Sequence, residues 1–265
     1  MKAMVLAAGL GTRLRPLTND RPKALVEING RTLLEITITR LAAVGVREII
    51  VNVHHFAEMV VDYLKHEKNF GLRIEVSREE DLLLDTGGGL KKAEWFFSEK
   101  SASRTGRDPE EPFLLHNVDV VSDIDFREML RFHTAQKALA TLAVQARESS
   151  RQLLFNSELQ LRGRRINGPD TLTAVEGPTG QSTCDMSPAP LLPLAFSGIH
   201  VLSPRIFPMI SETGVFSIID SYLRLAGRGE KILAFRHDGS YWRDLGRTAD
   251  FAQAASELRE NAAMS

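Results

Sequence analysis

Two glycines, an arginine and a lysine gather near the start of the chain, in a pattern that suits an anionic ligand. Gly9 and Gly11 follow the short apolar run Lys2–Ala7, which is typical of a buried strand. Glycines let backbone N–H groups approach phosphate oxygens because no Cβ stands in the way. Arg13 and Lys23 add positive charge to the same loop. The segment therefore predicts a phosphate-binding loop.

Two widespread phosphate motifs do not fit this loop. The dinucleotide fingerprint requires a third glycine at position 14, where the chain has Leu14. The P-loop requires Gly-Lys followed by Ser or Thr, and that triplet does not follow these glycines. A tight strand-to-helix turn with surface basic residues is the alternative interpretation.

Two aspartates far apart in the sequence are candidates for a metal site. Asp119 follows the predicted strand Phe113–His116 at its C-terminal end, where open α/β sheets bind ligands. Asp244 lies in the segment Tyr241–Gly246. Magnesium usually takes one or two protein carboxylates together with phosphates and water. By spacing alone, either aspartate could instead be a solvent-exposed loop residue or a helix cap. The nearby Ser122–Asp125 has the pattern of a helix cap.

Glycines mark two further segments. Leu84–Leu90 contains Asp-Thr-Gly-Gly-Gly and opens a predicted helix, Gly87–Phe97. Three glycines at a helix start are costly in entropy, so close approach of a ligand would explain them, with a flexible turn as the alternative. Phe196–Val201 has the pattern of a strand with one glycine, Gly198, which also suits a plain core strand.

The elements that would position these residues alternate between strands and helices over the first 135 residues. This alternation predicts βαβ units and a mostly parallel sheet. The predicted strands are Lys2–Ala7, Glu48–Val53, Leu72–Val76 and Phe113–His116, and the predicted helices are Thr32–Val44, Phe56–His66 and Gly87–Phe97.

The second half has strands at Ala195–Leu202 and Lys231–Phe235, and helices near Ser217–Ala226 and over Thr248–Asn261. Ser98–Pro112 and Gly163–Pro193 have the composition of loops, and the second is a candidate lid over substrate. We expect one domain over residues 1–265, with two halves at 1–135 and 136–265.

Composition limits the function. A hydrophobic content of 43% supports a sizeable core, and 33 basic against 34 acidic residues argue against a nucleic-acid or membrane-surface protein. The single cysteine excludes an intramolecular disulfide. The apolar run Ala3–Leu10 is too short for a signal or spanning segment, so a soluble, cytoplasmic protein is expected.

The N-terminal loop resembles the signature of the sugar-nucleotidyltransferase superfamily. The fitting positions are Gly9, Gly11, Thr12, Arg13, Leu14, Pro16, Thr18, Pro22 and Lys23. The resemblance implies a nucleotide-diphospho-sugar transferase fold, a Rossmann-like three-layer α/β/α sandwich with a mixed, mostly parallel sheet. It implies catalytic roles for Arg13 on the triphosphate and Lys23 on the reacting phosphates. The implied nucleotide-binding residues are Ala8, Gly9, Gly11, Thr12, Thr86 and Gly87.

The two aspartates also carry the resemblance. Asn117–Asp119 resembles the family's metal motif, and Trp242–Gly246 resembles its second aspartate motif, which implies that Asp119 and Asp244 hold Mg²⁺. Val118 stands where the family usually has glycine, which narrows the space beside the substrates. The implied sugar-binding residues are Asn117, Phe196 and Gly198. The implied enzyme is a nucleotidyltransferase of EC 2.7.7 type, which joins a nucleoside triphosphate to a sugar-1-phosphate and releases pyrophosphate.

Thr86 followed by three glycines resembles the bacterial N-acetylmuramate-1-phosphate uridylyltransferases, which implies a role in cell-wall recycling. Asp85 stands where that branch has glutamate. Glu79–Asp81 is similar to the acidic stretch of mannose-1-phosphate guanylyltransferases, in which a carboxylate would accept from guanine.

The sugar side departs from many relatives. The Glu-Lys-Pro whose lysine holds the sugar phosphate is missing, as in the uridylyltransferase branch, and Ser149–Arg151 replaces Tyr-Gly-Val. Arg151, Arg164 or Arg165 are candidates to replace that lysine. A CTP:phosphocholine cytidylyltransferase and a non-catalytic regulatory relative stay as alternatives, the second disfavoured because Arg13, Lys23 and both aspartates are present.

Overall fold

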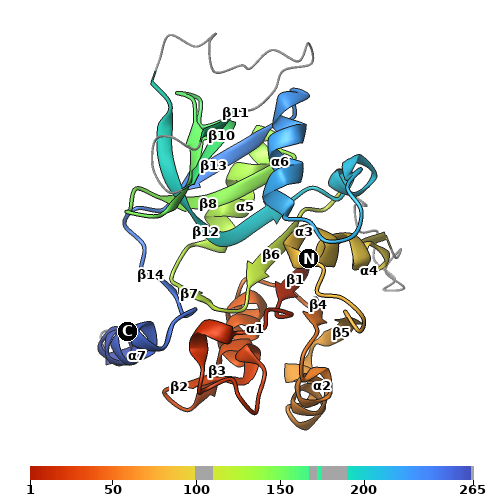
Figure 1. Cartoon of the computed structure of the whole chain (residues 1–265), viewed down its shortest axis with the longest axis vertical. Coiled ribbons are helices and arrows are strands. Elements are labelled where there is room, and N and C mark those ends of the chain that lie inside the picture. The colour runs from red at the N-terminus through yellow and green to blue at the C-terminus, as the bar shows by residue number, and fades with distance from the viewer. Residues whose placement is uncertain (99–109, 167–171, 175–189, 264–265) are drawn as a thin grey trace.

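Alternate side chains of strand β1 (Lys2–Leu6) enter two different hydrophobic cores. Ala3 and Val5 pack in one core with α1 (Leu33–Ala43), while Met4 packs in the other with α3 (Asp85–Lys92) and α6 (Ile218–Gly227). Successive side chains of a strand point to opposite faces of its sheet, so helices cover both faces. The computed structural model describes residues 1–98, 110–166, 172–174 and 190–263. The expected three-layer α/β/α sandwich is confirmed (Figure 1).

The N-terminal half holds the parallel part of the sheet. β1 pairs in parallel with β4 and β6, and β4 pairs in parallel with β5. The strands are β4 (Glu48–Val53), β5 (Arg73–Arg78) and β6 (Phe113–Asn117), and the helices are α1 (Leu33–Ala43) and α2 (Ala57–His66). Thr32 caps α1 by accepting a hydrogen bond from the N–H of Glu35 at 3.0 Å, at the first residue of the predicted helix Thr32–Val44.

The second half is joined to this sheet through antiparallel pairs. β12 (Leu192–Leu202) pairs antiparallel with β6, β8 and β9, so the mixed sheet is continuous (Figure 1). The other elements are α5 (Phe126–Gln136), β8 (Ala140–Gln145), β9 (Arg151–Phe155), α6 (Ile218–Gly227) and β13 (Ile232–Arg236). Asp125 caps α5, accepting from the N–H groups of Arg127 and Glu128.

Two expectations need correction. The predicted helix Gly87–Phe97 is two helices, α3 (Asp85–Lys92) and α4 (Glu94–Ser98). The ammonium of Lys2 donates to the carbonyl of Phe96 at 2.5 Å, so a tertiary contact holds the second helix.

The predicted loop Gly163–Pro193 is wrong where the chain is described. Residues there belong to β10 (Leu161–Ile166), β11 (Leu172–Ala174) and the start of β12. Backbone hydrogen bonds between antiparallel neighbours form β10 and β11 although their polar sequence has no apolar strand pattern. Residues 167–171 and 175–189 of the candidate lid Gly163–Pro193 lie outside the described residues. So does most of the predicted loop Ser98–Pro112.

The end of the chain returns to the N-terminal half. β14 (Trp242–Asp244) pairs with β7 (Val120–Ser122), and α7 (Thr248–Ala263) lies near the hairpin of β2 (Glu27–Ile28) and β3 (Arg31–Thr32) (Figure 1). The side chain of Asn29 donates to the carbonyl of Ala255 at 2.9 Å. Within the described ranges, every helix is too short or too polar to cross a membrane.

Candidate active site

The loop after β1 is shaped by Gly11, which has a left-handed φ of 64° at the start of a short 3-10 helix, Thr12–Leu14. A Cβ at Gly11 would lie 3.0 Å from Thr18 Cγ2 and 3.2 Å from Lys23 Cβ. The Thr18 hydroxyl also donates to the carbonyl of Gly11 at 2.9 Å. Glycine therefore lets the loop fold closely against the stem of Lys23.

Lys23 and Asp119 form an ion pair between two distant parts of the chain. Asp119 lies in the turn between β6 and β7, where the N–H of Val118 donates to the carbonyl of Leu6 at 3.1 Å. Lys23 is 8% exposed, so this positive charge is kept beside the carboxylate rather than in solvent. The pair confirms that the two predicted site residues lie together.

Asp244 reaches the same place through β14, whose pairing with β7 sets Asp244 opposite Val120. Burial raises the pKa of the Asp244 carboxyl, the nearby Asp119 raises it further, and the charges of Lys23 and Arg13 oppose both effects. A Cβ at Gly246 would lie 2.7 Å from Asp244 Oδ1 and 3.0 Å from Arg13 Nη2. The glycine therefore leaves room for a cluster of two carboxylates and two cationic side chains.

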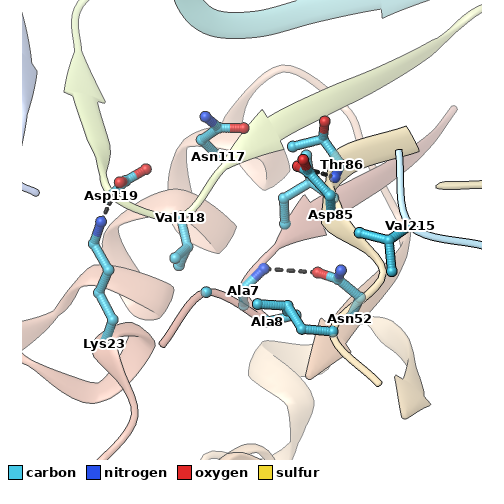
Figure 2. A pocket seen from close by; sticks show the side chains of 13 residues that line it. Ala7, Ala8, Lys23, Asn52, Asp85, Thr86, Asn117, Val118, Asp119 and Val215 are labelled. Atoms are coloured by element: carbon cyan, nitrogen blue, oxygen red, sulfur yellow. Dashed lines mark hydrogen bonds and ion pairs between the residues drawn. The ribbon is translucent and has the colours of Figure 1, made fainter. Parts of the chain in front are cut away.

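A cavity of about 350 Å³ opens on one side of this cluster. Figure 2 shows Lys23 and Asp119 pointing toward one another at one end, with Asn52, Asp85 and Val215 at the other. Its lining residues are Leu6, Ala7, Ala8, Gly9, Lys23, Asn52, Leu83, Asp85, Thr86, Asn117, Val118, Asp119 and Val215. Leu6–Gly9, Asn52 and Asn117–Asp119 lie at the C-terminal ends of the parallel strands β1, β4 and β6, the usual ligand position in such sheets.

A second cavity of about 810 Å³ opens on the other side. It is lined by Arg13, Asn117, Asp119, Val120, Arg147, Glu148, Ser149, Ser150, Arg151, Phe196, Ser197, Gly198, Trp242, Arg243, Asp244, Arg247 and Asp250. Asn117 and Asp119 belong to both cavities. Two ligands, one in each cavity, would therefore meet at Asp119.

The predicted site residues divide between these two spaces. Ala8, Gly9, Lys23 and Thr86 line the first cavity, while Arg13, Phe196, Gly198 and Asp244 line the second. Gly11 and Thr12 shape the loop beside Lys23.

The three glycines of α3 have a structural role that the sequence did not reveal. A Cβ at Gly87 would lie 2.3 Å from the Phe216 ring, and a Cβ at Gly88 would lie 2.4 Å from the carbonyl oxygen of Gly214. The N–H of Gly87 already donates to the carbonyl of Phe216 at 3.0 Å. Packing of α3 on residues 214–216 therefore accounts for Gly87 and Gly88 without a ligand, while the third glycine, Gly89, packs against Asn52 and Glu79.

Gly198 supports the second cavity. Its φ of 74° is left-handed, and a Cβ would lie 2.9 Å from both Asn117 Nδ2 and Val120 Cγ2. The Oδ1 atom of Asn117 is buried and has no hydrogen-bond partner among the described residues. This side chain therefore offers an acceptor for a ligand hydroxyl or amide group.

Arg147 is a candidate that sequence reasoning missed. Its guanidinium lies 3.9 Å from the centre of the Trp242 ring, and Nη2 donates to the carbonyl of Phe196 at 2.9 Å. Burial lowers the pKa of Arg147, an effect that Asp244 opposes. Its Nε is buried and unpaired within the part of the chain that the structure describes. The sequence did contain a signal for it: the apolar run 138–144 indicates a strand, and Arg147 follows the end of that strand, where ligands often bind.

The three arginines suggested by the sequence differ in position. Arg151 lines the second cavity. Arg164 pairs with Asp220 at 2.5 Å, and Arg165 donates to Gln152 at 2.5 Å. Both of these are therefore engaged elsewhere.

The described residues include no group of three or more His, Cys, Asp or Glu side chains that could hold a metal ion by themselves. Asp119 and Asp244 are a two-carboxylate donor set. Such a set suits Mg²⁺ only if phosphate oxygens and water complete the coordination.

Comparison with known proteins agrees with this geometry. The family described as Nucleotidyl transferase matches residues 2–261. The chain is 33% identical over 229 residues to N-acetylmuramate alpha-1-phosphate uridylyltransferase from Caulobacter vibrioides, covering 86% of this chain and 85% of that protein. It is 29% identical over 258 residues to mannose-1-phosphate guanyltransferase from Yarrowia lipolytica, covering 95% of this chain and 62% of that protein.

Solved structures share the fold. A UDP-glucose pyrophosphorylase complexed with UDP-glucose superposes with a TM-score of 0.73 at 18% identity, covering 98% of both chains. HddC from Yersinia pseudotuberculosis, complexed with GMP-PN, gives 0.69 at 19% identity, covering 97% of this chain and 99% of that one. The chain therefore belongs to the nucleotidyl transferase family and is an enzyme of the sugar-1-phosphate nucleotidyltransferase type.

Proposed function

We propose that this enzyme transfers the uridylyl group of UTP to N-acetylmuramate-1-phosphate. The main support for this reaction is the position of Asp119, which lines both cavities and lies beside Lys23 and Asp244. UTP would occupy the first cavity and the sugar-1-phosphate the second, so that their phosphates meet at this carboxylate.

The choice of uracil is supported by the relative from Caulobacter vibrioides. Glu79 is 1% exposed, and its two carboxylate oxygens accept from Asn52 and from the N–H of Leu84. Of the acidic stretch Glu79–Asp81, only Glu80 and Asp81 are therefore exposed to accept from a guanine edge. GTP with mannose-1-phosphate stays the second candidate because several relatives carry that name.

In the proposed reaction, an oxygen of the sugar-1-phosphate attacks the α-phosphorus of UTP. The new P–O bond forms as the bond to the β-phosphate oxygen breaks, and pyrophosphate leaves with the electron pair. The attacking phosphate is mostly dianionic at neutral pH, since its second pKa is about 6, so no general base is required. The main task is to bring two anions together and stabilise the leaving group.

The chain's own residues divide this task. Lys23 would contact the α-phosphate, because it lines the first cavity next to Asp119. Arg13 lines the second cavity beside Asp244, so it would bind the triphosphate where the phosphates of UTP extend past Asp119 out of the first cavity. Arg147, and beside it Arg151, would hold the phosphate of the sugar substrate in place of the missing lysine.

Asp119 and Asp244 would hold Mg²⁺. Their proximity, which raises the pKa of Asp244, and their hard oxygen donors fit a cation that phosphates also coordinate. When bound, the metal would neutralise and orient the phosphates of both substrates.

The test is pyrophosphate release with Mg²⁺, in which UTP, GTP, CTP and dTTP are each combined with four acceptors. The acceptors are N-acetylmuramate-1-phosphate, mannose-1-phosphate, glucose-1-phosphate and phosphocholine. We expect release with UTP and N-acetylmuramate-1-phosphate. Release with GTP and mannose-1-phosphate alone would replace this substrate pair by the second candidate. If no pair releases pyrophosphate but the protein binds a nucleotide in a titration, the non-catalytic alternative would be favoured.

A further inference from the structure

A buried chain of hydrogen bonds runs behind the first cavity. The N–H of Ala7 donates to Asn52 Oδ1 at 2.7 Å, a bond drawn in Figure 2. Asn52 Nδ2 donates to Glu79 Oε1 at 2.7 Å, and the N–H of Leu84 donates to Glu79 Oε2 at 2.8 Å. Asn52 is 3% exposed and Glu79 is 1% exposed, so water does not compete strongly for these bonds.

This series of hydrogen bonds connects two walls of the first cavity. Ala7 belongs to the wall that continues into Ala8 and Gly9, while Leu84 precedes Asp85 and Thr86 in the other wall. The backbone of Glu79 is itself held, because its N–H donates to Val53 at 2.8 Å and its carbonyl oxygen lies 2.5 Å from His54 Nδ1. Both walls are therefore attached to one fixed carboxylate.

The polarity of the chain is determined at each step. Ala7 and Leu84 both present N–H donors, so Asn52 must accept on one side and donate on the other. Glu79 must then accept through both oxygens, which a carboxylate does. A Cβ at Gly89 would lie 2.8 Å from both Asn52 Nδ2 and Glu79 Oε1, so this glycine provides the room for the pair.

We propose that Asn52 and Glu79 are positioning residues for the nucleoside triphosphate. They set the distance between the wall at 7–9 and the wall at 83–86, and thereby the affinity for the nucleotide. Glu79 acts without touching the substrate, through Asn52 and the backbone of Leu84. The inference rests on the proposed function, because it requires the first cavity to be the nucleotide site.

The decisive test reverses the polarity of the pair. In Glu79→Gln the single amide oxygen can accept from Asn52 or from Leu84 but not from both, so the new NH2 group faces a second donor. In Asn52→Asp two carboxylates face each other. In the double variant Asn52→Asp/Glu79→Gln, the new amide at 79 donates to the new carboxylate at 52. The amide oxygen at 79 still accepts from Leu84, and the carboxylate at 52 still accepts from Ala7. The double variant therefore restores every hydrogen bond and keeps one negative charge.

We expect each single change to raise the Kd for UTP, measured by titration, by about tenfold or more, since a buried polar group loses its partner. The KM for the triphosphate should rise equally and the KM for the sugar phosphate far less. The double variant should recover the wild-type Kd and the wild-type unfolding midpoint. Glu158→Gln, the same change at an exposed residue between β9 and β10 that lines neither cavity, is the control and should behave as wild type.

A double variant that stays as impaired as the single ones, in nucleotide affinity or in folding, would overturn the inference. Single variants that bind UTP with the wild-type Kd would do the same. A wild-type enzyme that binds another triphosphate in place of UTP would contradict the proposed substrate, and the variants would then be titrated with that nucleotide.

Discussion

The N–H of Leu245 donates to the carbonyl oxygen of Asp119 at 2.8 Å, and this bond joins the two motifs of the site. The bond extends the pairing of β14 with β7 by one residue, so the position of Asp119 in the turn determines where Asp244 lies. The two carboxylates are close enough for Asp119 to raise the pKa of Asp244. The antiparallel pairing of two short strands therefore builds the proposed magnesium site.

Asp119→Asn is expected to lower kcat about 10²–10³-fold, by analogy with the loss of other electrostatic stabilisers. Folding should be retained although the ion pair with Lys23 is lost, because Asp244 still interacts with the charge of Lys23 and the repulsion between the two carboxylates is removed. The measurement is pyrophosphate release over a range of Mg²⁺ concentrations, beside thermal unfolding. Asp123→Asn, at an exposed position nearby, is the matched control. Retention of most activity by Asp119→Asn would show that this carboxylate does not serve the reaction.

Arg13→Ala is expected to reduce kcat by a similar factor of about 10²–10³. The Arg13 side chain is exposed, so the unfolding temperature should stay close to that of wild type. Arg21→Ala removes an exposed arginine of the same loop that pairs with Asp20, and should leave kcat unchanged. Equal kinetics for the two variants would remove Arg13 from the site.

Arg147→Met is expected to raise the KM for the sugar-1-phosphate about 10–100-fold, which corresponds to the loss of one hydrogen bond to a charged group. Methionine keeps an unbranched side chain against Trp242, so the packing is largely preserved. The KM for the nucleotide should change little.

The control for this prediction is Arg164→Met, which removes an arginine paired with Asp220. Both substrates are varied in steady-state kinetics of the two variants. A rise in the nucleotide KM alone would assign Arg147 to the other ligand.

Gly198→Ala is expected to destabilise the protein by about 1–3 kcal/mol, because alanine is strained at this left-handed φ and its Cβ would press on Asn117 and Val120. The KM for the sugar phosphate should also rise, since Asn117 must move. Gly239→Ala is the control, because nothing lies within 4 Å of its Cβ position. Urea unfolding measures the difference, and two equally stable variants would contradict the strain.

His200 is expected to make stability fall in acid. It is 1% exposed, and burial lowers its pKa from 6.5 to about 3, with a smaller contribution from His116. The unfolded state therefore binds this proton first, so the stabilisation is complete above pH 6.5 and is lost as the pH falls toward 3. The slope for one such group approaches about 1.4 kcal/mol per pH unit.

The measurement is the urea unfolding free energy of wild type and His200→Gln between pH 7 and 4, a range chosen around the unfolded value of about 6.5. The variant should lose stability less steeply as the pH falls. His66→Gln changes a largely exposed histidine and should keep the wild-type slope. An unchanged slope in His200→Gln would exclude this residue as a source of acid sensitivity.

Local sequence patterns were sufficient for much of the fold. The helical period of Leu33, Leu34, Ile38, Leu41 and Val44 predicts the buried face of α1. The first four are fully buried, and Val44, which follows the last residue of the helix, is half-buried. The cap pattern of Ser122–Asp125 is confirmed, because Asp125 caps α5, and Thr32 and Ser217 cap α1 and α6 in the same way. These features depend on residues within a few positions of one another, so the sequence alone contains their physical cause.

By itself, the sequence determined the residue types of the site: the glycine loop with Arg13 and Lys23, and the two aspartates. Only the tertiary structure decided that Asp119 lies between two cavities, that Arg147 faces one of them, and that Gly87 is needed for packing on Phe216. It also decided that Glu79 is held inside the protein. The reason is that these relationships join strands and loops far apart in the chain, and no local period or cap encodes which of them will pair.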